Sequence, residues 1–169
     1  TRYPNNFLDS CVIRVRPIVK KTRQQLDEIE IISTYLFSDA FTNCDDSRSY
    51  STGVNSDDFA GDNDYGDFIV AEINFDGKED FVVKRNSGGN GGPEYEYYIQ
   101  KGNGEFTRDS FLSDSMRFFP NAFNSSGRQL TTVVHASAGY FGQTTYELDS
   151  DSLGWKMVEH NWIGNDAKK

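Results

Sequence analysis

Short stretches in which apolar and polar residues alternate cover most of the chain and predict β-strands. Val, Ile, Tyr, Phe and Trp are concentrated in these stretches, and such side chains favour the pleated surface of a sheet. Segments rich in Gly, Asn and Asp separate them, which is typical of turns between antiparallel strands. From residue 67 onward, the predicted strands cover residues 68–73, 80–85, 94–101, 130–136, 144–148 and 155–162.

The first third of the chain is less regular. Residues 12–19 and 26–32 predict a hairpin around the polar turn 20–25. We expect a short helical piece over residues 33–41, because its large apolar side chains fall on one helical face. Residues 44–65 are polar and have no period, so they predict a long loop.

These elements predict an all-β, mainly antiparallel fold with two packed sheets. Aromatic residues make up 14% of the chain and would supply much of its core. Residues 111–123 add a cluster of Phe, Leu and Met that fits a short helix. No period of about 20–50 residues repeats, which excludes a full propeller or a solenoid. We expect residues 1–66 to form an N-terminal hairpin and acidic loop, and residues 67–169 a β domain, in one compact unit.

The net charge of −9 is concentrated in one segment of the chain. Residues 45–80 hold eleven acidic residues against two basic ones, Arg48 and Lys78, and this imbalance equals the whole net charge. Such a segment repels nucleic acid and anionic lipid, so no nucleic-acid partner is expected. It suits a divalent cation or a basic protein partner. For most of these acidic residues, a solvated loop is the simpler interpretation.

The two cysteines, Cys11 and Cys44, predict a single disulfide formed in an oxidising compartment. The alternative is two unpaired, buried thiols. No transmembrane run is present in the sequence. The chain starts at Thr1 rather than Met, which is compatible with a leader or a lipid anchor upstream of Thr1. We therefore expect a periplasmic or secreted protein.

The segment Glu72–Asp80 predicts a calcium-binding loop. Oxygen-bearing side chains occupy its positions 1, 3, 5 and 9, which are Glu72, Asn74, Asp76 and Asp80. Calcium takes about six to eight oxygen ligands, and the backbone carbonyl of Lys78 would supply the one at position 7. Gly77 at position 6 permits the backbone angle that such a tight turn requires.

Three alternatives to a calcium loop fit the residues less well. An EF-hand would need a bidentate Glu at position 12, where this chain has Val83, and the flanking residues predict strands rather than helices. Magnesium is disfavoured because it demands stricter octahedral geometry and more waters. An acidic turn without metal would leave four carboxylates repelling one another within nine residues. This repulsion favours a bound cation.

No catalytic set is evident in the sequence. His135 and His160 lie in separate predicted strands, and no nucleophile elbow accompanies them. We therefore expect that the protein is not an enzyme. The segment Ser137–Thr144 is a different kind of candidate, because it places Tyr140 and Phe141 at a predicted hairpin tip. Exposed aromatic side chains on such a tip often bind partners, whereas rings folded back onto the sheet would only pack.

The loop Glu72-Ile-Asn-Phe-Asp-Gly-Lys-Glu-Asp80, followed by a Gly-rich turn and Tyr95-Glu-Tyr-Tyr98, resembles the calcium-binding periplasmic lipoproteins of Gram-negative bacteria. The resemblance covers roughly residues 67–162. Some members of that family are immunity proteins against peptidoglycan hydrolases delivered by contact-dependent secretion systems. Their β-fold is similar to that of the C-type lysozyme inhibitors. This chain departs from the pattern at Glu72, where Asp is usual.

The resemblance implies that this chain binds Ca²⁺ and inhibits a lysozyme-like peptidoglycan hydrolase. C-type lysozyme inhibitors insert a loop bearing Ser, Gly and Tyr into the hydrolase cleft, and residues 137–146, with Trp155 downstream, are loosely similar to that loop. The implied partner-binding residues are Ser137, Gly139, Tyr140, Phe141 and Tyr146. Two alternatives stay open on the sequence: a calcium-dependent adhesion or structural module resembling a single propeller blade, and a calcium-supported hydrolase.

Overall fold

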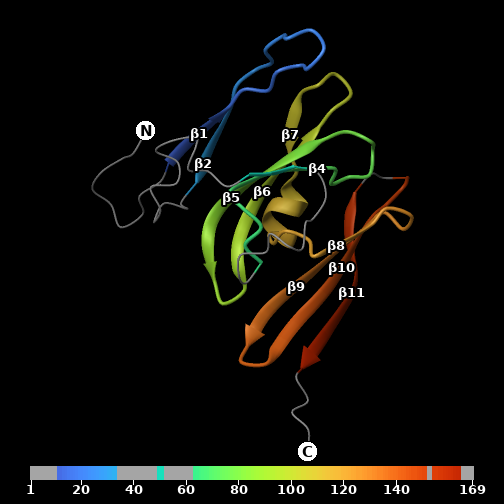
Figure 1. The fold of residues 1–169 in the computed structure, drawn as a ribbon. Coiled ribbons are helices and arrows are strands. Elements are labelled where there is room, and N and C mark those ends of the chain that lie inside the picture. Colours follow the sequence, from blue (N-terminus) through green and yellow to red (C-terminus); the bar gives the residue numbers. More distant parts are fainter. Residues whose placement is uncertain (1–10, 34–48, 52–62, 152–153, 165–169) are drawn as a thin grey trace, which may run out of the picture.

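A computed structural model describes residues 11–33, 49–51, 63–151 and 154–164 of the chain, and its described elements are almost entirely strands (Figure 1). The one helix among them is a short π-helix, η4. The elements in chain order are β1 (Cys11–Val15), β2 (Ile29–Ser33), β3 (Ser49–Ser51), β4 (Phe68–Ala71), β5 (Asp80–Gly89), β6 (Gly92–Gln100), β7 (Phe106–Arg108), η4 (Phe111–Met116), β8 (Ala122–Asn124), β9 (Gln129–Ser137), β10 (Tyr140–Leu148) and β11 (Trp155–Gly164).

The strands form three sheets. One has five strands in the order β3-β4-β5-β6-β7, one has four strands in the order β11-β10-β9-β8, and β1 pairs with β2 alone. Neighbouring strands are antiparallel except for β3 and β4, which are parallel. The predicted all-β, mainly antiparallel fold with a short helix is confirmed. Among the described helices, none is long and apolar enough to cross a membrane.

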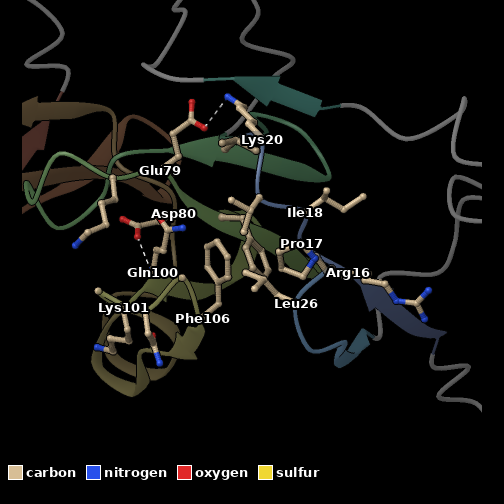
Figure 2. A pocket seen from close by; sticks show the side chains of 18 of the residues that line it. Arg16, Pro17, Ile18, Lys20, Leu26, Glu79, Asp80, Gln100, Lys101 and Phe106 are labelled. Carbon is tan, nitrogen blue, oxygen red and sulfur yellow. Dashed lines mark hydrogen bonds and ion pairs between the residues drawn. The ribbon is translucent and has the colours of Figure 1, made fainter. Parts of the chain in front are cut away.

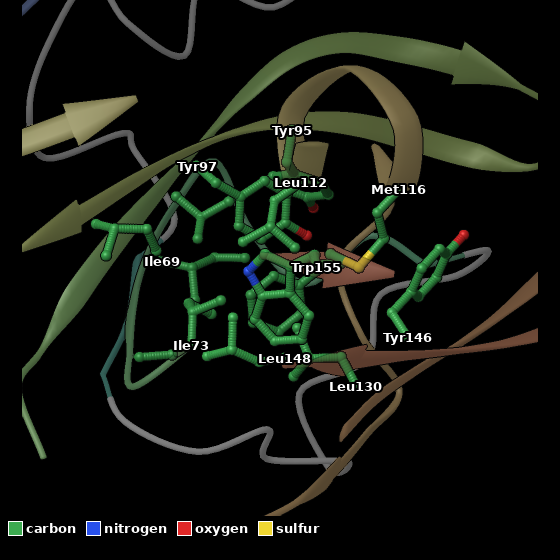
Figure 3. Close-up of a cluster of buried hydrophobic side chains, with 14 of the residues drawn as sticks. Ile69, Ile73, Tyr95, Tyr97, Leu112, Met116, Leu130, Tyr146, Leu148 and Trp155 are labelled. Carbon is green, nitrogen blue, oxygen red and sulfur yellow. The ribbon is translucent and has the colours of Figure 1, made fainter. Parts of the chain in front are cut away.

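The main core lies between one face of the five-stranded sheet, the four-stranded sheet and η4 (Figure 3). Alternate residues of β6 point into it, so Tyr95, Tyr97 and Ile99 are buried there. Trp155 and Leu148 enter from the four-stranded sheet. This single core joins the two sheets. Its other members are Tyr65, Ile69, Ala71, Ile73, Val82, Leu112, Met116, Phe119, Leu130 and Tyr146.

The opposite face of the five-stranded sheet is covered by the β1–β2 hairpin. Ile31 of β2 is buried against Phe81 and Val83 of β5. The ring of Phe81 stacks on Tyr98, with ring centroids 4.8 Å apart, and on Phe68, at 5.4 Å. Because β5 is covered on both faces, its apolar residues run consecutively instead of alternating with polar ones.

A buried ion pair joins β5 to the residues just before β4. The Lys84 side chain is 1% exposed, and its Nζ lies 2.8 Å from Oδ1 of Asp67, which is also 1% exposed. Oδ1 of Asp64 is a second partner at 2.6 Å. A lysine buried this deeply keeps its charge only when paired. These carboxylates belong to the acidic segment, so part of that segment has a structural role.

Several sequence predictions differ from the structure in extent. The predicted strands 80–85 and 94–101 end too far from the Gly-rich turn between them, because β5 continues to Gly89 and β6 begins at Gly92, with pairing irregularities near Asn86. The short strands β3, β7 and β8 were not predicted. The predicted N-terminal hairpin is confirmed by β1, β2 and a bridge between Ile18 and Gln25. The helical piece expected over 33–41 lies outside the described residues, except for Ser33 at the end of β2.

Candidate functional site

The predicted calcium loop connects β4 to β5 and folds as a tight turn. Gly77 has a φ of +82°, the left-handed conformation expected at position 6. Phe75 also has a positive φ of +58°, which is uncommon for a residue with a side chain. The Phe75 ring packs against Trp155 of β11, with ring centroids 6.4 Å apart. The loop is therefore attached to the four-stranded sheet as well as to β5.

Asp80, at position 9, lies at the base of the loop and is 1% exposed. Its Oδ2 accepts a hydrogen bond from the backbone N–H of Ile73 at 2.8 Å, and its Oδ1 accepts one from Gln100 at 2.9 Å. Burial raises the pKa of Asp80 to about 6, and the nearby charge of Asp76 adds to the rise. A cation placed beside this carboxylate would favour its charged form.

The other two predicted carboxylate ligands, Glu72 and Asp76, contact the loop's own backbone. Oε1 of Glu72 accepts a hydrogen bond from the N–H of Gly77 at 2.5 Å. Asp76 accepts one from the backbone N–H of Lys78 at 3.0 Å and one from its ammonium group at 2.8 Å. Burial alone would raise the pKa of Asp76, but these bonds outweigh it and lower that pKa. The Lys78 side chain thus pairs with Asp76, and its backbone carbonyl stays a predicted ligand.

Asn74, at position 3, carries the feature that fits a metal best. Its Oδ1 is buried and has no hydrogen-bond partner, which is true of only one other side-chain atom in the described part of the chain. A buried polar atom without a partner is costly unless something else satisfies it. An amide oxygen among carboxylates is a ligand set that calcium prefers. In the described residues, no group of three or more His, Cys, Asp and Glu side chains converges on one point, so these ligands would have to exchange some backbone bonds for the cation.

The predicted hairpin tip is the turn between β9 and β10, at the end of the four-stranded sheet that projects beyond the five-stranded one (Figure 1). The turn is tighter than predicted, because β10 begins at Tyr140. Gly139 supplies a φ of +83° in this turn. Tyr140 is 55% exposed and pairs with Ser137, which is also exposed. Phe141 is partly covered because its ring stacks on His135, with ring centroids 4.9 Å apart.

Tyr146 lies apart from these tip residues. It is 9% exposed, belongs to the main core, and meets Phe111 edge to face at 5.9 Å between ring centroids. Burial raises the pKa of its hydroxyl. The structure therefore brings Ser137, Gly139, Tyr140 and Phe141 together and places Tyr146 deeper in the same sheet. Trp155, the downstream Trp of the resemblance, is also buried in the core.

A groove of about 240 Å³ runs from Tyr146 toward the tip across the face of the four-stranded sheet, as far as Ala136 and Gly142. Trp162 and His160 of β11 line it, together with Arg117 and Phe118 from the segment after η4. Trp162 is 66% exposed, and its ring meets His160 edge to face at 5.1 Å. Nδ1 of His160 lies 2.8 Å from the hydroxyl of Thr144, which fixes the imidazole.

Sequence reasoning missed His160 and Trp162 as site residues. Trp162 lies opposite Gly142 in the β10–β11 register, and the missing side chain at Gly142 leaves room for the imidazole of His160. A pairing irregularity between Thr145 and Tyr146 shifts the register. This shift decides which residues of β11 face the groove. The spacing of His160 and Trp162, two residues apart in a predicted strand, was the only available signal.

Comparison with known proteins finds a similar structure but no matching sequence family. No protein-family model matches the chain, and no match was found among curated proteins. A solved structure of a Xanthomonas protein, described as related to a Type IV Secretion System, superposes with a TM-score of 0.62. It is 20% identical in sequence, and the match covers 99% of this chain and 76% of that one. At this level of identity the likeness concerns the fold.

Only one of the two cysteines of the predicted disulfide is among the described residues. Cys11 begins β1, whereas Cys44 lies outside the described residues. The disulfide stays a prediction.

Proposed function

We propose that this protein is a calcium-binding inhibitor, an immunity protein, of a lysozyme-like peptidoglycan hydrolase in the periplasm or outside the cell. It acts by binding rather than by catalysis. The β9–β10 tip enters the cleft of the hydrolase, and the loop 72–80 holds a Ca²⁺ ion that stiffens the sheet. The neighbour's description as related to a Type IV Secretion System is compatible with a role in countering secreted effectors.

The observation that carries the proposal is the pair of exposed aromatic side chains at the end of the four-stranded sheet. Tyr140 and Trp162 are 55% and 66% exposed and lie diagonally across β10 and β11. Large aromatic side chains at this exposure gain much from burial in a partner, and Tyr and Trp dominate the binding energy of many interfaces. Tyr140 follows a short turn and Trp162 lies within the paired strand β11, so little conformational freedom is lost on binding.

The chemistry of a lysozyme-like cleft complements this tip. Such hydrolases carry two carboxyl groups that flank the scissile bond. The hydroxyl groups of Tyr140 and Ser137 are donors that would hydrogen-bond to those carboxyl groups and exclude the substrate. The acidic character of the chain, with a net charge of −9, would speed its encounter with a basic hydrolase.

The calcium ion has a structural role in this proposal. Side-chain oxygens of Glu72, Asn74, Asp76 and Asp80, with the carbonyl of Lys78, would hold it. The contact between Phe75 and Trp155 links the loop to the first residue of β11, and Trp162 lies near the other end of the same strand. A ligand that binds only the folded loop stabilises the fold by mass action.

A turbidity assay on peptidoglycan suspensions tests the proposal against its alternatives. The chain is added alone and together with a hydrolase encoded by a neighbouring gene. Protection of the suspension from that hydrolase is the expected result. Lysis by the chain alone would identify an enzyme, and absence of both effects would point to an adhesion or structural module.

A further inference from the structure

A second concave site lies far from the tip along the chain. A cleft of about 690 Å³ opens between the β1–β2 connection, the β4–β5 side of the five-stranded sheet and the turn that leads into β7 (Figure 2). Its volume is in the range of small-molecule sites, about 300–1,000 Å³. It shares Lys78, Glu79 and Asp80 with the predicted calcium loop and no residue with the tip or the groove. The site is therefore separate from the proposed inhibitory surface.

The walls of this cleft are mainly apolar. Pro17 and Leu26 line one side, across from Phe106 (Figure 2), and Ile18 and Phe81 are also among the lining residues. Ile18 is 51% exposed, so the core does not account for its apolar surface. Apolar area removed from water contributes about 25 cal/mol per Å². A ligand with an apolar body would cover this surface.

The wall formed by the β1–β2 connection is held by backbone hydrogen bonds. The N–H of Leu26 donates to the carbonyl of Pro17 at 3.0 Å, and the N–H of Val19 donates to the carbonyl of Gln24 at 2.9 Å. A bridge between Ile18 and Gln25 lies between them. The wall is therefore an ordered small ladder, and the cleft is formed before a ligand arrives.

The charge around the cleft is opposite in sign to that of the whole chain. Four basic side chains line it, and they outnumber its two carboxylates, Glu79 and Asp80. Glu79 pairs with Lys20 at 3.4 Å, and Asp80 accepts backbone hydrogen bonds. Among the described residues, Arg16, Lys20 and Lys78 each form an ion pair, and Lys101 is the one basic residue of the cleft for which none is found. The cleft thus offers one uncompensated ammonium group beside an apolar wall.

We propose that this cleft binds a linear apolar chain that ends in a single carboxylate, such as a medium-chain fatty acid. The apolar walls take the chain, and Lys101 pairs with the head group. One negative charge matches the one uncompensated cation, whereas the second charge of a doubly charged head group would find no further unpaired cation among the described residues of the cleft.

The proposal is tested by calorimetric titration of the full chain with decanoate, below the concentration at which micelles form and with calcium at no more than one equivalent. Saturable binding at one site is expected, with weaker binding of decan-1-ol, which lacks the charge. Absence of saturable binding, or equal affinity for the alcohol, would overturn the proposal.

Matched variants locate the site. Lys101→Glu is expected to weaken decanoate binding by about tenfold or more, whereas Lys21→Glu, in the same region but outside the cleft, changes it by less than about twofold. Ile18→Glu is expected to weaken binding, and Ile32→Glu, which is 62% exposed in the wild type and outside the cleft, is its control. Equal losses in variants and controls would contradict the assignment.

A measurement on the unaltered chain removes any dependence on how well the variants fold. Decanoate is expected to shift the backbone amide resonances of Ile18, Leu26 and Phe106. Shifts confined to the β9–β10 tip would place the ligand on the proposed inhibitory surface instead and overturn the cleft. Because the two sites share no residue, failure of decanoate binding leaves the hydrolase assay unaffected, and the reverse also holds.

Discussion

The carboxylate of Asp80 accepts a hydrogen bond from the backbone N–H of Ile73 at 2.8 Å, which ties the two ends of the calcium loop together. A second bond, from Gln100, attaches the same carboxylate to β6. Asp80 is therefore a structural clamp of the turn as well as a predicted metal ligand. Because of its structural role, removal of Asp80 should destabilise the protein even when no metal is bound.

Replacing Asp80 with alanine should lower the free energy of unfolding by about 2–4 kcal/mol, because two backbone N–H groups lose a buried acceptor. Urea denaturation in the presence of a chelator measures this loss without any contribution from calcium. Glu79→Ala is the matched control. Because Glu79 is exposed, its replacement should cost less than about 1 kcal/mol. Equal losses in the two variants would contradict the clamp.

The pH dependence of stability should also carry the signature of Asp80. Its pKa is about 6 in the folded protein, against 3.8 for an aspartate side chain in water. The folded state therefore binds a proton more tightly than the unfolded state, so this residue's contribution to stability increases as the pH falls from 7 toward 4. In metal-free protein, the free energy of unfolding of the wild type minus that of Asp80→Asn should therefore increase as the pH falls from 7 toward 4. A difference that is flat between pH 7 and 4 would contradict it.

The buried Lys84 should be far more sensitive to substitution than an exposed lysine in an ion pair. Lys84→Met leaves Asp67 buried without its cation, and breaking a buried pair in this way costs about 3–5 kcal/mol. Lys156→Met, which removes the exposed pair with Glu147, should leave the melting temperature almost unchanged. Thermal unfolding of both variants provides the comparison, and similar melting temperatures would refute the difference.

Asn74→Ala distinguishes a calcium ligand from an ordinary turn residue. In the presence of a chelator, the variant should lose less than about 1 kcal/mol, because the removed Oδ1 has no hydrogen-bond partner in the described structure and the rest of the amide gives up only its bond to Asp76. With calcium, it should bind the ion about tenfold more weakly, since one ligand is lost. Calorimetric titration and melting curves give both quantities. A variant that is destabilised equally with and without calcium would exclude Asn74 from the metal site.

The sequence predicted the strands that have a clear local signature. Asp76-Gly77 marked the turn between β4 and β5, and the Gly-rich segment around Gly139 marked the turn between β9 and β10. The left-handed φ of Gly77 and Gly139 explains why these positions were recognisable. Strand β5 was predicted from its apolar residues alone, although they face two different cores.

What the sequence could not predict depends on contacts between distant segments. Strands β7 and β8 have three residues each, too few to show a period, and are held by their neighbours. The groove needs β11 to pair with β10 in one register, and the irregularity next to Tyr146 is not visible in the residue pattern. Without that register, His160 could not be placed beside Thr144, nor Trp162 opposite Gly142.

The most direct test is the strength with which Tyr140→Ala and Trp162→Ala inhibit the hydrolase encoded by a neighbouring gene. Both side chains are exposed, so both variants should fold with unchanged stability. We expect inhibition to be weakened by about tenfold or more for each, and to be unchanged for Ile32→Ala, whose side chain is similarly exposed and lies in the β1–β2 hairpin. Full inhibition by the Tyr140 and Trp162 variants would contradict binding through the β9–β10 tip.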